Sequence, residues 1–439
     1  MPLSNLLPTM DSVLSDREKR WRYRAKLAQK TTVVSMTLRL PHALRLSYPD
    51  ILEKALSPLQ DIGLVLRESS KDADGPTYFF ESKEGAESVK RKTVFLEDTL
   101  PIGRFLDIDV SDSEGAISRS ELGLPTRGCL VCGCRAWDCI KSRRHSTDEI
   151  LDIIEKTLFP IEKNLESEIA RYAAIAAEEE LRLLYKPGLV TPITNGAHKD
   201  LDFHLMRKTL EGLKPFWLEC AKRGLSADKA TPEFLAELRH LGIEAEKRMF
   251  DASSGVNTYR GLLYLLGILC AAVSYALSHH QRLEDVFEAT RLMASEELKR
   301  NPNTRTRAKE QGFSSYFGAR GETASGFKTV HKALDFFLDR KRKTSSRAEA
   351  LTDTLIYLIS NTYDTNVLGR GGREGMFFMQ HSASEIMEVG GLLTQKGTKL
   401  YRQFLLETLQ RNLSPGGAAD LLICTAFLDR IAFLFGKKS

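Results

Sequence analysis

Two aspartates, Asp107 and Asp109, form the first pattern that could do chemistry, in the segment GRFLDIDV (103–110). Side chains alternate between the faces of a β-strand, so both carboxylates would project from one face and the apolar residues from the other. Such a pair is costly unless a proton or cation lies between the carboxylates, and Mg²⁺ prefers carboxylates together with substrate phosphates. The pattern predicts a nucleotidyl-transfer site, where Gly103 and Arg104 would let backbone and guanidinium approach a phosphate. The alternative is a solvated strand face.

Four of the seven cysteines lie close together, in the pattern C-x₂-C-x-C-x₄-C, and a histidine follows. Cys129, Cys132, Cys139 and His145 could bind Zn²⁺ tetrahedrally, because C-x₂-C spacing suits two ligands on one turn. A redox pair is a second interpretation, although a redox C-x-x-C normally opens a helix after a strand. A third is that the cysteines are small buried packing residues.

A basic run accompanies the cysteines and comprises Arg135, Lys141, Arg143 and Arg144. These side chains could bind a triphosphate or an acidic protein. The alternative is an ordinary solvated charged face.

The segment YKPGLVTPITNGAHKDLDF (185–203) is the first of four polar segments that interrupt helical patterns after residue 155. Lysines and backbone N–H groups at a helix N-terminus favour phosphates. Carboxylates there could hold Mg²⁺ on those phosphates. The candidate residues are Lys186, His198 and Lys199 for the substrate, and Asp200 and Asp202 for Mg²⁺.

Three further polar segments have the same character, and we expect all of them to be loops. Glycines in such segments allow close backbone approach, although Gly-rich helix connections are most often only caps and turns. The Walker pattern is absent from the sequence, which points away from P-loop hydrolysis. The candidates are Asn257 and Arg260 in 253–261, Arg320 and Glu322 in 318–327, and Asp364, Asn366 and Arg370 in 364–372.

Composition sets the class of protein. The chain has 439 residues, and its 63 Lys and Arg against 58 Asp and Glu give a net charge of +5, too small to demand nucleic acid. The apolar run 261–277 is shorter than the roughly 18 residues of a membrane span, so we expect a buried helix and no membrane partner. The first 21 residues do not resemble a secretion signal. A cytoplasmic location with reduced thiols follows as an expectation.

Periodicity predicts two domains of different class. Alternation predicts strands at 31–41, 93–96 and 105–110, with turns at 71–76 and 111–115. After Ser146, which begins a capping signature with Glu149, nearly all patterns are helical. The sequence predicts a multidomain chain, with an N-terminal α+β nucleotidyltransferase-like domain at 1–155 and an all-α helical domain at 156–439. The amphipathic segments are 232–250, 283–300, 325–343 and 399–413.

Three motifs of the first domain resemble a known family. GRFLDIDV, SRSELGLP (118–125) and CLVC…C…SRRHS occur in the order found in the holo-acyl-carrier-protein synthase of citrate lyase, the phosphoribosyl-dephospho-CoA transferase. The resemblance covers about residues 1 to 155. It implies transfer of a phosphoribosyl-dephospho-CoA group to a serine of the apo acyl carrier protein, the gamma subunit of citrate lyase, with release of pyrophosphate. Glu97 or Asp98, at the end of the preceding predicted strand, would complete the metal shell, and Cys134 is outside the family pattern.

The four polar segments together resemble triphosphoribosyl-dephospho-CoA synthase over about residues 165 to 435. The resemblance implies that the 2′-hydroxyl of 3′-dephospho-CoA attacks the ribose C1′ of ATP and that adenine leaves. This glycosyl transfer needs a carboxylate near C1′ and a proton donor near adenine. Glu322, Asp364 and His198 are the candidates for these roles, in no order that the sequence separates.

The same resemblance implies how the triphosphate is held and where this chain departs from the family. Lysines and arginines of the four segments would bind the triphosphate through Mg²⁺. The chain has Tyr259-Arg260 where the family usually has His-Lys, and Gly369 replaces a common histidine, so neither histidine is an essential acid here. The triphosphate ligands are Lys186, Lys199, Arg320 and Arg370.

Both resemblances on one chain imply a fused bifunctional enzyme that builds the citrate lyase prosthetic group from ATP and dephospho-CoA. Tethering would raise the local concentration of the intermediate. One alternative is a zinc-ribbon adaptor that binds nucleic acid or an acidic partner through 135–144, although interleaved aromatics are lacking. Another is that only one half is catalytic and the other is a docking module.

Overall fold

The computed structural model describes residues 9–297, 318–344 and 346–436. The chain forms two compact units, Met1–Pro160 and Ile161–Ser439.

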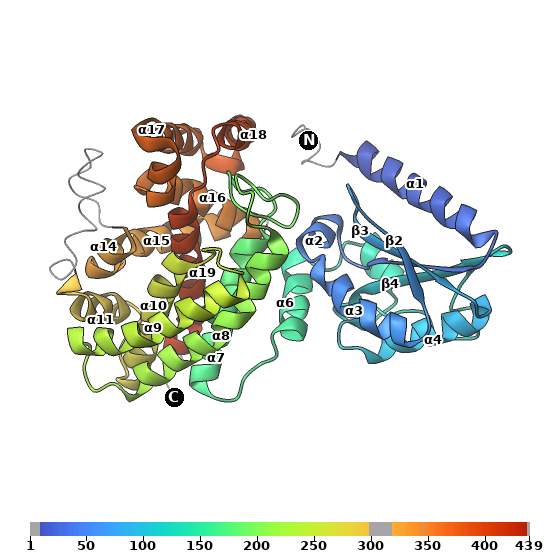
Figure 1. The fold of residues 1–439 in the computed structure, drawn as a ribbon, viewed down its shortest axis with the longest axis horizontal. Coiled ribbons are helices and arrows are strands. Elements are labelled where there is room, and N and C mark those ends of the chain that lie inside the picture. Colours follow the sequence, from blue (N-terminus) through green and yellow to red (C-terminus); the bar gives the residue numbers. More distant parts are fainter. Residues whose placement is uncertain (1–8, 298–317, 345, 437–439) are drawn as a thin grey trace. The chain divides into compact units, whose positions relative to one another are not determined.

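The first unit contains a five-stranded antiparallel sheet in the order β2-β3-β1-β4-β5 (Figure 1). The predicted turns 71–76 and 111–115 are confirmed, since they join β2 to β3 and β4 to β5. The strands are β1 Thr32–Leu38, β2 Val65–Asp72, β3 Gly75–Ser82, β4 Leu106–Asp112 and β5 Gly115–Ile117.

Helices pack on both faces of this sheet. The core face packs against α3 and α4, while α1 crosses the opposite face of β1 and β4 (Figure 1). The predicted capping box is confirmed, because Ser146 and Glu149 cap each other at the start of α6, whose Ile154 is buried in the core of this unit. The helices are α1 Met10–Ala28, α2 His42–Ser47, α3 Asp50–Asp61, α4 Ala86–Thr99, the 3₁₀ turn η2 Gly103–Phe105, α5 Ala136–Lys141 and α6 Thr147–Leu158.

The predicted strand 93–96 is wrong, because these residues lie inside α4. Val89, Thr93, Leu96 and Glu97 are buried at spacings of four, three and one, which is a helical face. A window of four residues was too short to show that period.

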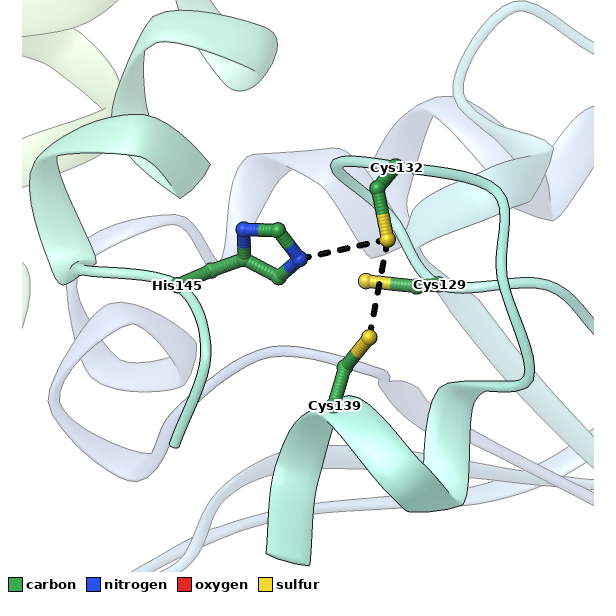
Figure 2. Close-up of side chains that lie close together, drawn as sticks. All are labelled: Cys129, Cys132, Cys139 and His145. Atoms are coloured by element: carbon green, nitrogen blue, oxygen red, sulfur yellow. Dashed lines mark hydrogen bonds between the residues drawn. The ribbon is translucent and has the colours of Figure 1, made fainter. Parts of the chain in front are cut away.

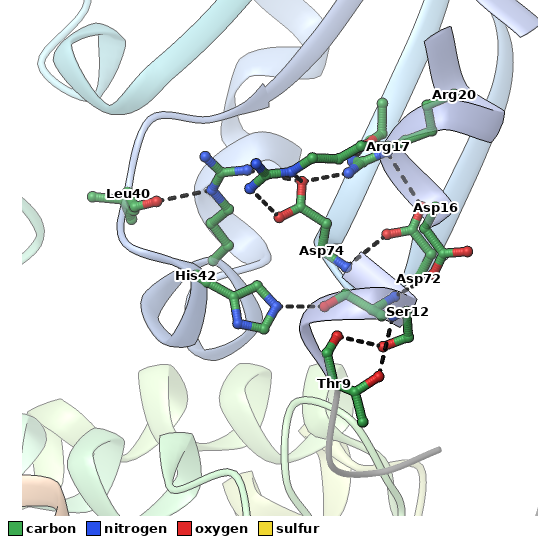
Figure 3. A network of polar contacts seen from close by, with 12 residues as sticks. Thr9, Ser12, Asp16, Arg17, Arg20, Leu40, His42, Asp72 and Asp74 are labelled. Atoms are coloured by element: carbon green, nitrogen blue, oxygen red, sulfur yellow. Dashed lines mark hydrogen bonds and ion pairs between the residues drawn. The ribbon is translucent and has the colours of Figure 1, made fainter. Parts of the chain in front are cut away.

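A buried aspartate ties α1 to the β2–β3 hairpin (Figure 3). Asp74 accepts hydrogen bonds from Arg17 (2.8 Å to Oδ1) and Arg20 of α1, and from Arg45 of α2 (2.9 Å). Burial alone opposes ionisation of Asp74, but the three guanidinium groups outweigh it and lower its pKa overall. The network fixes α1 across the sheet.

The regular elements of the second unit, in its described residues, are helices joined by loops such as 183–202. At its centre lies α10, which packs against α7, α8, α9, α11 and α19 (Figure 1). Among the described residues α10 is the one helix long and apolar enough to cross a membrane, but 72% of its apolar window is buried in the unit, as expected for a core helix. The helices are α7 Leu165–Arg182, α8 Phe203–Ser226, α9 Pro232–Ala252, α10 Arg260–Ser278, α11 Asp285–Met293, α14 Gly318–Ala324, α15 Lys328–Lys343, α16 Arg347–Asn361, α17 Thr365–Glu388, η3 Gly391–Leu393, α18 Gln395–Gln410 and α19 Gly416–Gly436.

Two of the four expected loops are wrong in part. Residues 318–324 form α14, and 365–372 form the first turns of α17, which kinks at Gly372 (φ 58°, ψ −152°). Asp364 caps α17 by accepting from the backbone N–H groups of Asn366 and Val367, so the helix begins despite its glycines. Predicted helices at 232–250, 325–343 and 399–413 correspond to α9, α15 and α18. The segment 283–300 contains α11, a turn at 294–296 and the helical residue Glu297, and residues 298–300 lie outside the described residues.

Candidate active sites

The first candidate site lies on the α1 side of β4. Leu106, Ile108 and Val110 are buried in the core, whereas Asp107 and Asp109 project from the opposite face, as the alternation predicted. Desolvation by the surrounding protein, and then the charge of Asp109, raise the pKa of Asp107. A divalent cation bound between the two carboxylates would offset the repulsion that raises the pKa of Asp107.

Arginines that the sequence did not single out surround this carboxylate pair. Arg24 of α1 donates to Asp109 Oδ2 at 2.8 Å. The guanidinium of Arg127 opposes the rise in the pKa of Asp107. Arg39 and Arg45 also act electrostatically on Asp107, and burial lowers the pKa of both guanidinium groups. These residues are scattered over a hundred positions, so no local motif could have found them.

Glu97 lies in α4, not at the end of a strand, and it is hydrogen-bonded to β4, the strand that carries Asp107 and Asp109. Its Oε1 accepts from the backbone N–H of Ile108 (3.1 Å) and from Arg127 (3.1 Å), and its Oε2 accepts from Arg119 (2.7 Å). Asp98 is paired with Arg119 as well, at 2.9 Å. Both acids proposed to complete a metal shell are therefore engaged by arginine, and Arg119 belongs to the SRSELGLP motif.

The predicted basic residues of this unit lie at its surface. Arg104 is exposed and donates to the backbone oxygen of Leu130. Arg143 and Arg144 are exposed in the turn after α5, where Arg143 adopts a left-handed conformation with φ 48°.

The four predicted zinc ligands come together (Figure 2). One ligand atom each from Cys129, Cys132, Cys139 and His145 all lie within 4.8 Å of one another. Cys132 Sγ is 3.5 Å from Cys139 Sγ and 3.3 Å from His145 Nε2. Cys134, which is outside the family pattern, is exposed and does not belong to this group of four.

The local environment favours a thiolate in this cluster. The backbone N–H of Cys134, and then the imidazole of His145, lower the pKa of Cys132 to about 6. Desolvation and the neighbouring sulfurs raise the pKa of Cys139 to about 12. The cluster therefore stabilises one thiolate, and a second thiolate is disfavoured unless a cation is bound between the sulfurs.

The second candidate site is a cavity of about 1150 Å³ within the second unit. All four polar segments of the sequence contribute to its wall, together with α9 and the start of α19. The predicted residues that line it are Lys186, His198, Asp200, Asn257, Arg260, Arg320, Glu322, Asn366 and Arg370.

Three predicted residues of this unit are not in the cavity wall. Lys199 is exposed on the preceding loop. Asp202 caps α8 by accepting from the backbone N–H of Leu205 at 2.8 Å. Asp364, besides capping α17, accepts from the N–H of Ala418 at 2.9 Å, which joins α17 to α19. The predicted Asp200–Asp202 pair therefore does not converge on the cavity.

His198 is a neutral hydrogen-bonding residue at the cavity wall. Arg370 donates to its Nδ1 (3.1 Å), so Nδ1 is the acceptor and Nε2 carries the proton toward Ser414 Oγ (2.9 Å). Burial, and then the charge of Arg370, lower the pKa of His198 to about 4. Arg370 also donates to the backbone oxygen of Ala197 (2.8 Å), which holds the loop against α17.

Two other predicted residues are constrained by their partners. Lys186 is buried and donates to Glu180 Oε1 (2.6 Å) and to its backbone oxygen (2.8 Å). Glu322 Oε1 accepts from the N–H groups of Thr329 (2.8 Å) and Val330 (3.1 Å) at the start of α15. Burial nevertheless raises the pKa of Glu322.

Asp420 and Tyr259 lie in the cavity wall, and the sequence predicted a functional role for neither. Burial, and then the charges of Asp364 and Glu180, raise the pKa of Asp420 well above its ordinary value. A lone acid in the apolar first half of α19 was the available signal, because an isolated buried charge is costly. Tyr259 is buried, and its hydroxyl has no hydrogen-bond partner among the described residues.

Comparisons with known proteins agree with the two-unit organisation. The family ATP:dephospho-CoA triphosphoribosyl transferase (CitG) matches residues 166–439, and apo-citrate lyase phosphoribosyl-dephospho-CoA transferase (CitX) matches residues 8–159. Protein CitXG of Leuconostoc mesenteroides subsp. cremoris is 33% identical over 95% of this chain and 96% of its own length. The chain belongs to the CitXG family.

Other relatives match a part of the chain. A CitXG protein of Haemophilus influenzae is 33% identical over 78% of the chain and 77% of its own length. A probable 2-(5''-triphosphoribosyl)-3'-dephosphocoenzyme-A synthase of Vibrio cholerae is 34% identical over 58% of the chain and 85% of its own length. The predicted resemblance is confirmed, and membership of CitXG makes the chain a bifunctional transferase of citrate lyase prosthetic-group synthesis, which the adaptor alternative does not explain.

Proposed function

We propose that the second unit makes 2′-(5″-triphosphoribosyl)-3′-dephospho-CoA from ATP and 3′-dephospho-CoA, with release of adenine. The first unit then transfers the phosphoribosyl-dephospho-CoA group to a serine of the apo acyl carrier protein of citrate lyase and releases pyrophosphate. The observation that carries the proposal is the convergence of four separate polar segments on one cavity, which mixes guanidinium groups with buried acids.

In the second unit a glycosyl bond is exchanged. The bond from ribose C1′ to adenine breaks while a bond from C1′ to the 2′-oxygen of dephospho-CoA forms. The hydroxyl proton goes to a carboxylate, and adenine leaves more easily when it receives a proton. We assign the proton donor to Asp420, whose surroundings favour the protonated form, and the base to Glu322, which lines the same cavity.

The remaining cavity residues bind and orient the substrates. Arg260, Arg320 and Arg370 line the cavity and would hold the triphosphate. His198, neutral and bonded to Arg370, positions that guanidinium and is not a proton donor in this assignment. Asp200 is the predicted Mg²⁺ ligand that lies in the wall, and Mg²⁺ there would offset the triphosphate charge.

In the first unit a phosphoryl group is transferred. The serine oxygen attacks the phosphorus next to the ribose, and the bond to pyrophosphate breaks. Asp107, with its raised pKa, is suited to accept the serine proton, and Arg39 and Arg127 lie where they can stabilise the phosphates. Asp107 and Asp109 are the residues that would hold Mg²⁺, and the ion would supply positive charge for the phosphates. The sulfur donors of the Cys–His cluster suit Zn²⁺ instead.

Two substitutions in the full-length protein test these assignments. Asp107→Asn is expected to lower pyrophosphate release from the donor and apo carrier protein by about 10²- to 10⁴-fold, with adenine release unchanged. Asp420→Asn is expected to lower adenine release by a similar factor and to leave transfer of pre-made donor intact. Each half-reaction is the control for the other, and the reverse pattern would show that the sites are assigned to the wrong units.

A further inference from the structure

The cysteine-rich segment 128–145, called the cysteine knuckle below, has the donor set and spacing of a tetrahedral zinc site. Ligands about 2.0–2.3 Å from a tetrahedral zinc ion are separated by roughly 3.3–3.8 Å. Two of the separations, 3.5 Å between the sulfurs of Cys132 and Cys139 and 3.3 Å between Cys132 Sγ and His145 Nε2, fall in that range, and all four ligand atoms lie within 4.8 Å of one another. The separation of the two sulfurs is far too long for a disulfide, and all seven cysteines are free.

The backbone of the knuckle is already folded around this position. Cys129 N–H donates to the oxygen of Cys134, and Gly133 N–H donates to the oxygen of Cys129 (3.1 Å). Gly133 has φ 72°, and a Cβ at Gly128 would meet the oxygen of Gly133 at 2.6 Å, so both glycines serve the tight turn. The N–H of Val131 points at Cys129 Sγ (3.5 Å).

A second layer of contacts supports metal binding. His145 Nδ1 lies 3.4 Å from Glu149 Oε1, which leaves Nε2 to face the sulfurs. A carboxylate on the far nitrogen is the usual partner of a metal-bound histidine. The packing interpretation fits poorly, because Cys132 is exposed and Cys129 is only partly buried.

The knuckle is bonded to the segment that precedes Asp107. Arg39 donates to the oxygen of Gly128 at 2.7 Å, and Arg104 donates to the oxygen of Leu130. Arg127, next to the knuckle, donates to the oxygens of Gly103 (3.0 Å) and Leu106. Two guanidinium groups therefore link residues 127–130 to residues 103–106, and a third links Gly128 to Arg39, whose backbone N–H donates to the oxygen of Phe105 (2.7 Å).

We infer that the knuckle binds one structural zinc ion, and that this ion fixes Arg127 and Arg39 beside Asp107 for the transfer reaction. The part concerning transfer rests on the proposed function of the first unit. Loss of zinc would release residues 128–130, which removes the acceptors of Arg39 and Arg104 and frees Arg127 to move. A displacement of about 1 Å in such positioning groups can cost about a hundredfold in rate.

The metal is tested on the full-length protein with two matched variants. Cys132→Ser removes a predicted ligand, whereas Cys134→Ser removes an exposed thiol two residues away. Elemental analysis is expected to give about one zinc per chain for the wild type and for Cys134→Ser, and markedly less for Cys132→Ser. Cobalt(II) in place of zinc should give thiolate-to-cobalt absorption. A wild type purified without zinc that takes up neither metal would overturn the inference.

The positioning role is tested by removing zinc, restoring Mg²⁺ and measuring both half-reactions. Pyrophosphate release is expected to fall by at least about tenfold and to recover with added Zn²⁺, while adenine release by the same molecules is unchanged. Hydrogen exchange should increase in residues 103–106 as well as in 127–146. If zinc-free protein transfers at the full rate with unchanged exchange at 103–106, the positioning role is refuted. If zinc-loaded protein shows neither activity, the proposed function fails and the zinc site stands.

Discussion

The neutral state of His198 makes the second unit sensitive to acid. The pKa of the imidazole is lowered from 6.5 to about 4 in the folded unit. Between these two pH values the imidazole is protonated in the unfolded chain but not in the folded chain. The contribution of the neutral imidazole to stability is therefore fully present above pH 6.5 and is lost as the pH falls toward 4. Between about pH 7.5 and about pH 5 the loss from this residue is about 2 kcal/mol.

Asparagine at this position separates the titration from the hydrogen bond. His198→Asn keeps an acceptor near the place of Nδ1 for Arg370 but cannot be protonated. The variant is expected to lose about 1 kcal/mol at neutral pH with the Ser414 bond, and its stability should fall by about 2 kcal/mol less than that of the wild type on acidification. His381→Asn, at an exposed histidine of α17, is expected to follow the wild type.

Denaturant unfolding followed by tryptophan fluorescence can isolate the second unit. Trp217 is fully buried in α8, whereas Trp21 and Trp137 are 62% and 63% exposed in the first unit. With both exposed tryptophans replaced by phenylalanine, emission reports the second unit alone. If wild type and His198→Asn lose the same stability between the two pH values, the assignment of a neutral, buried imidazole is incorrect.

Two further substitutions follow from contacts in the second unit. Glu179 accepts hydrogen bonds from Arg347 and Arg430, and although burial opposes ionisation, the charges of these arginines lower the pKa of Glu179 to about 2. Because Glu179→Gln would leave two buried guanidinium groups without their counter-charge, it should lower the free energy of unfolding by at least about 3 kcal/mol at neutral pH. The advantage of the wild type should vanish as the pH falls from 4.5 toward 2, and equal Trp217 unfolding midpoints at neutral pH would contradict this. A Cβ at Gly261 would meet Asp420 Oδ2 at 2.2 Å, so Gly261→Ala should lower adenine release by about tenfold or more and spare transfer. Unchanged adenine release would show that the carboxyl position is immaterial.

Features that depend on residues close together in the sequence were predicted correctly. The alternation in β4 placed Asp107 and Asp109 on one face, and the C-x₂-C spacing gathered three cysteines with His145. The apolar run of α10 became the core of the second unit. In each case a short segment contains both the periodic signal and the residues that it positions.

Contacts between distant segments could not be predicted in this way. Arg24 reaches Asp109 from another element, 85 positions away, and Asp364 bonds the N–H of Ala418, 54 positions away. The segment 364–372 is helical from Thr365 because the capping side chain of Asp364 offsets the unfavourable propensity of its glycines. Glu97 was interpreted as a metal ligand because its arginine partners come from 22 and 30 residues farther along the chain.

Because β4 has one buried apolar face and one face with the carboxylates, the chain does not tolerate an insertion or deletion just before this strand. An inserted or deleted residue just before Leu106 would turn the carboxylates into the hydrophobic interior and present leucine, isoleucine and valine to the phosphates. Glu97, by holding the amide of Ile108, would resist such a slip at one fixed position. We therefore expect length variation in natural relatives and in engineered chains to fall in the β4–β5 turn, beyond Asp112, and not in the short η2 turn that leads into the strand.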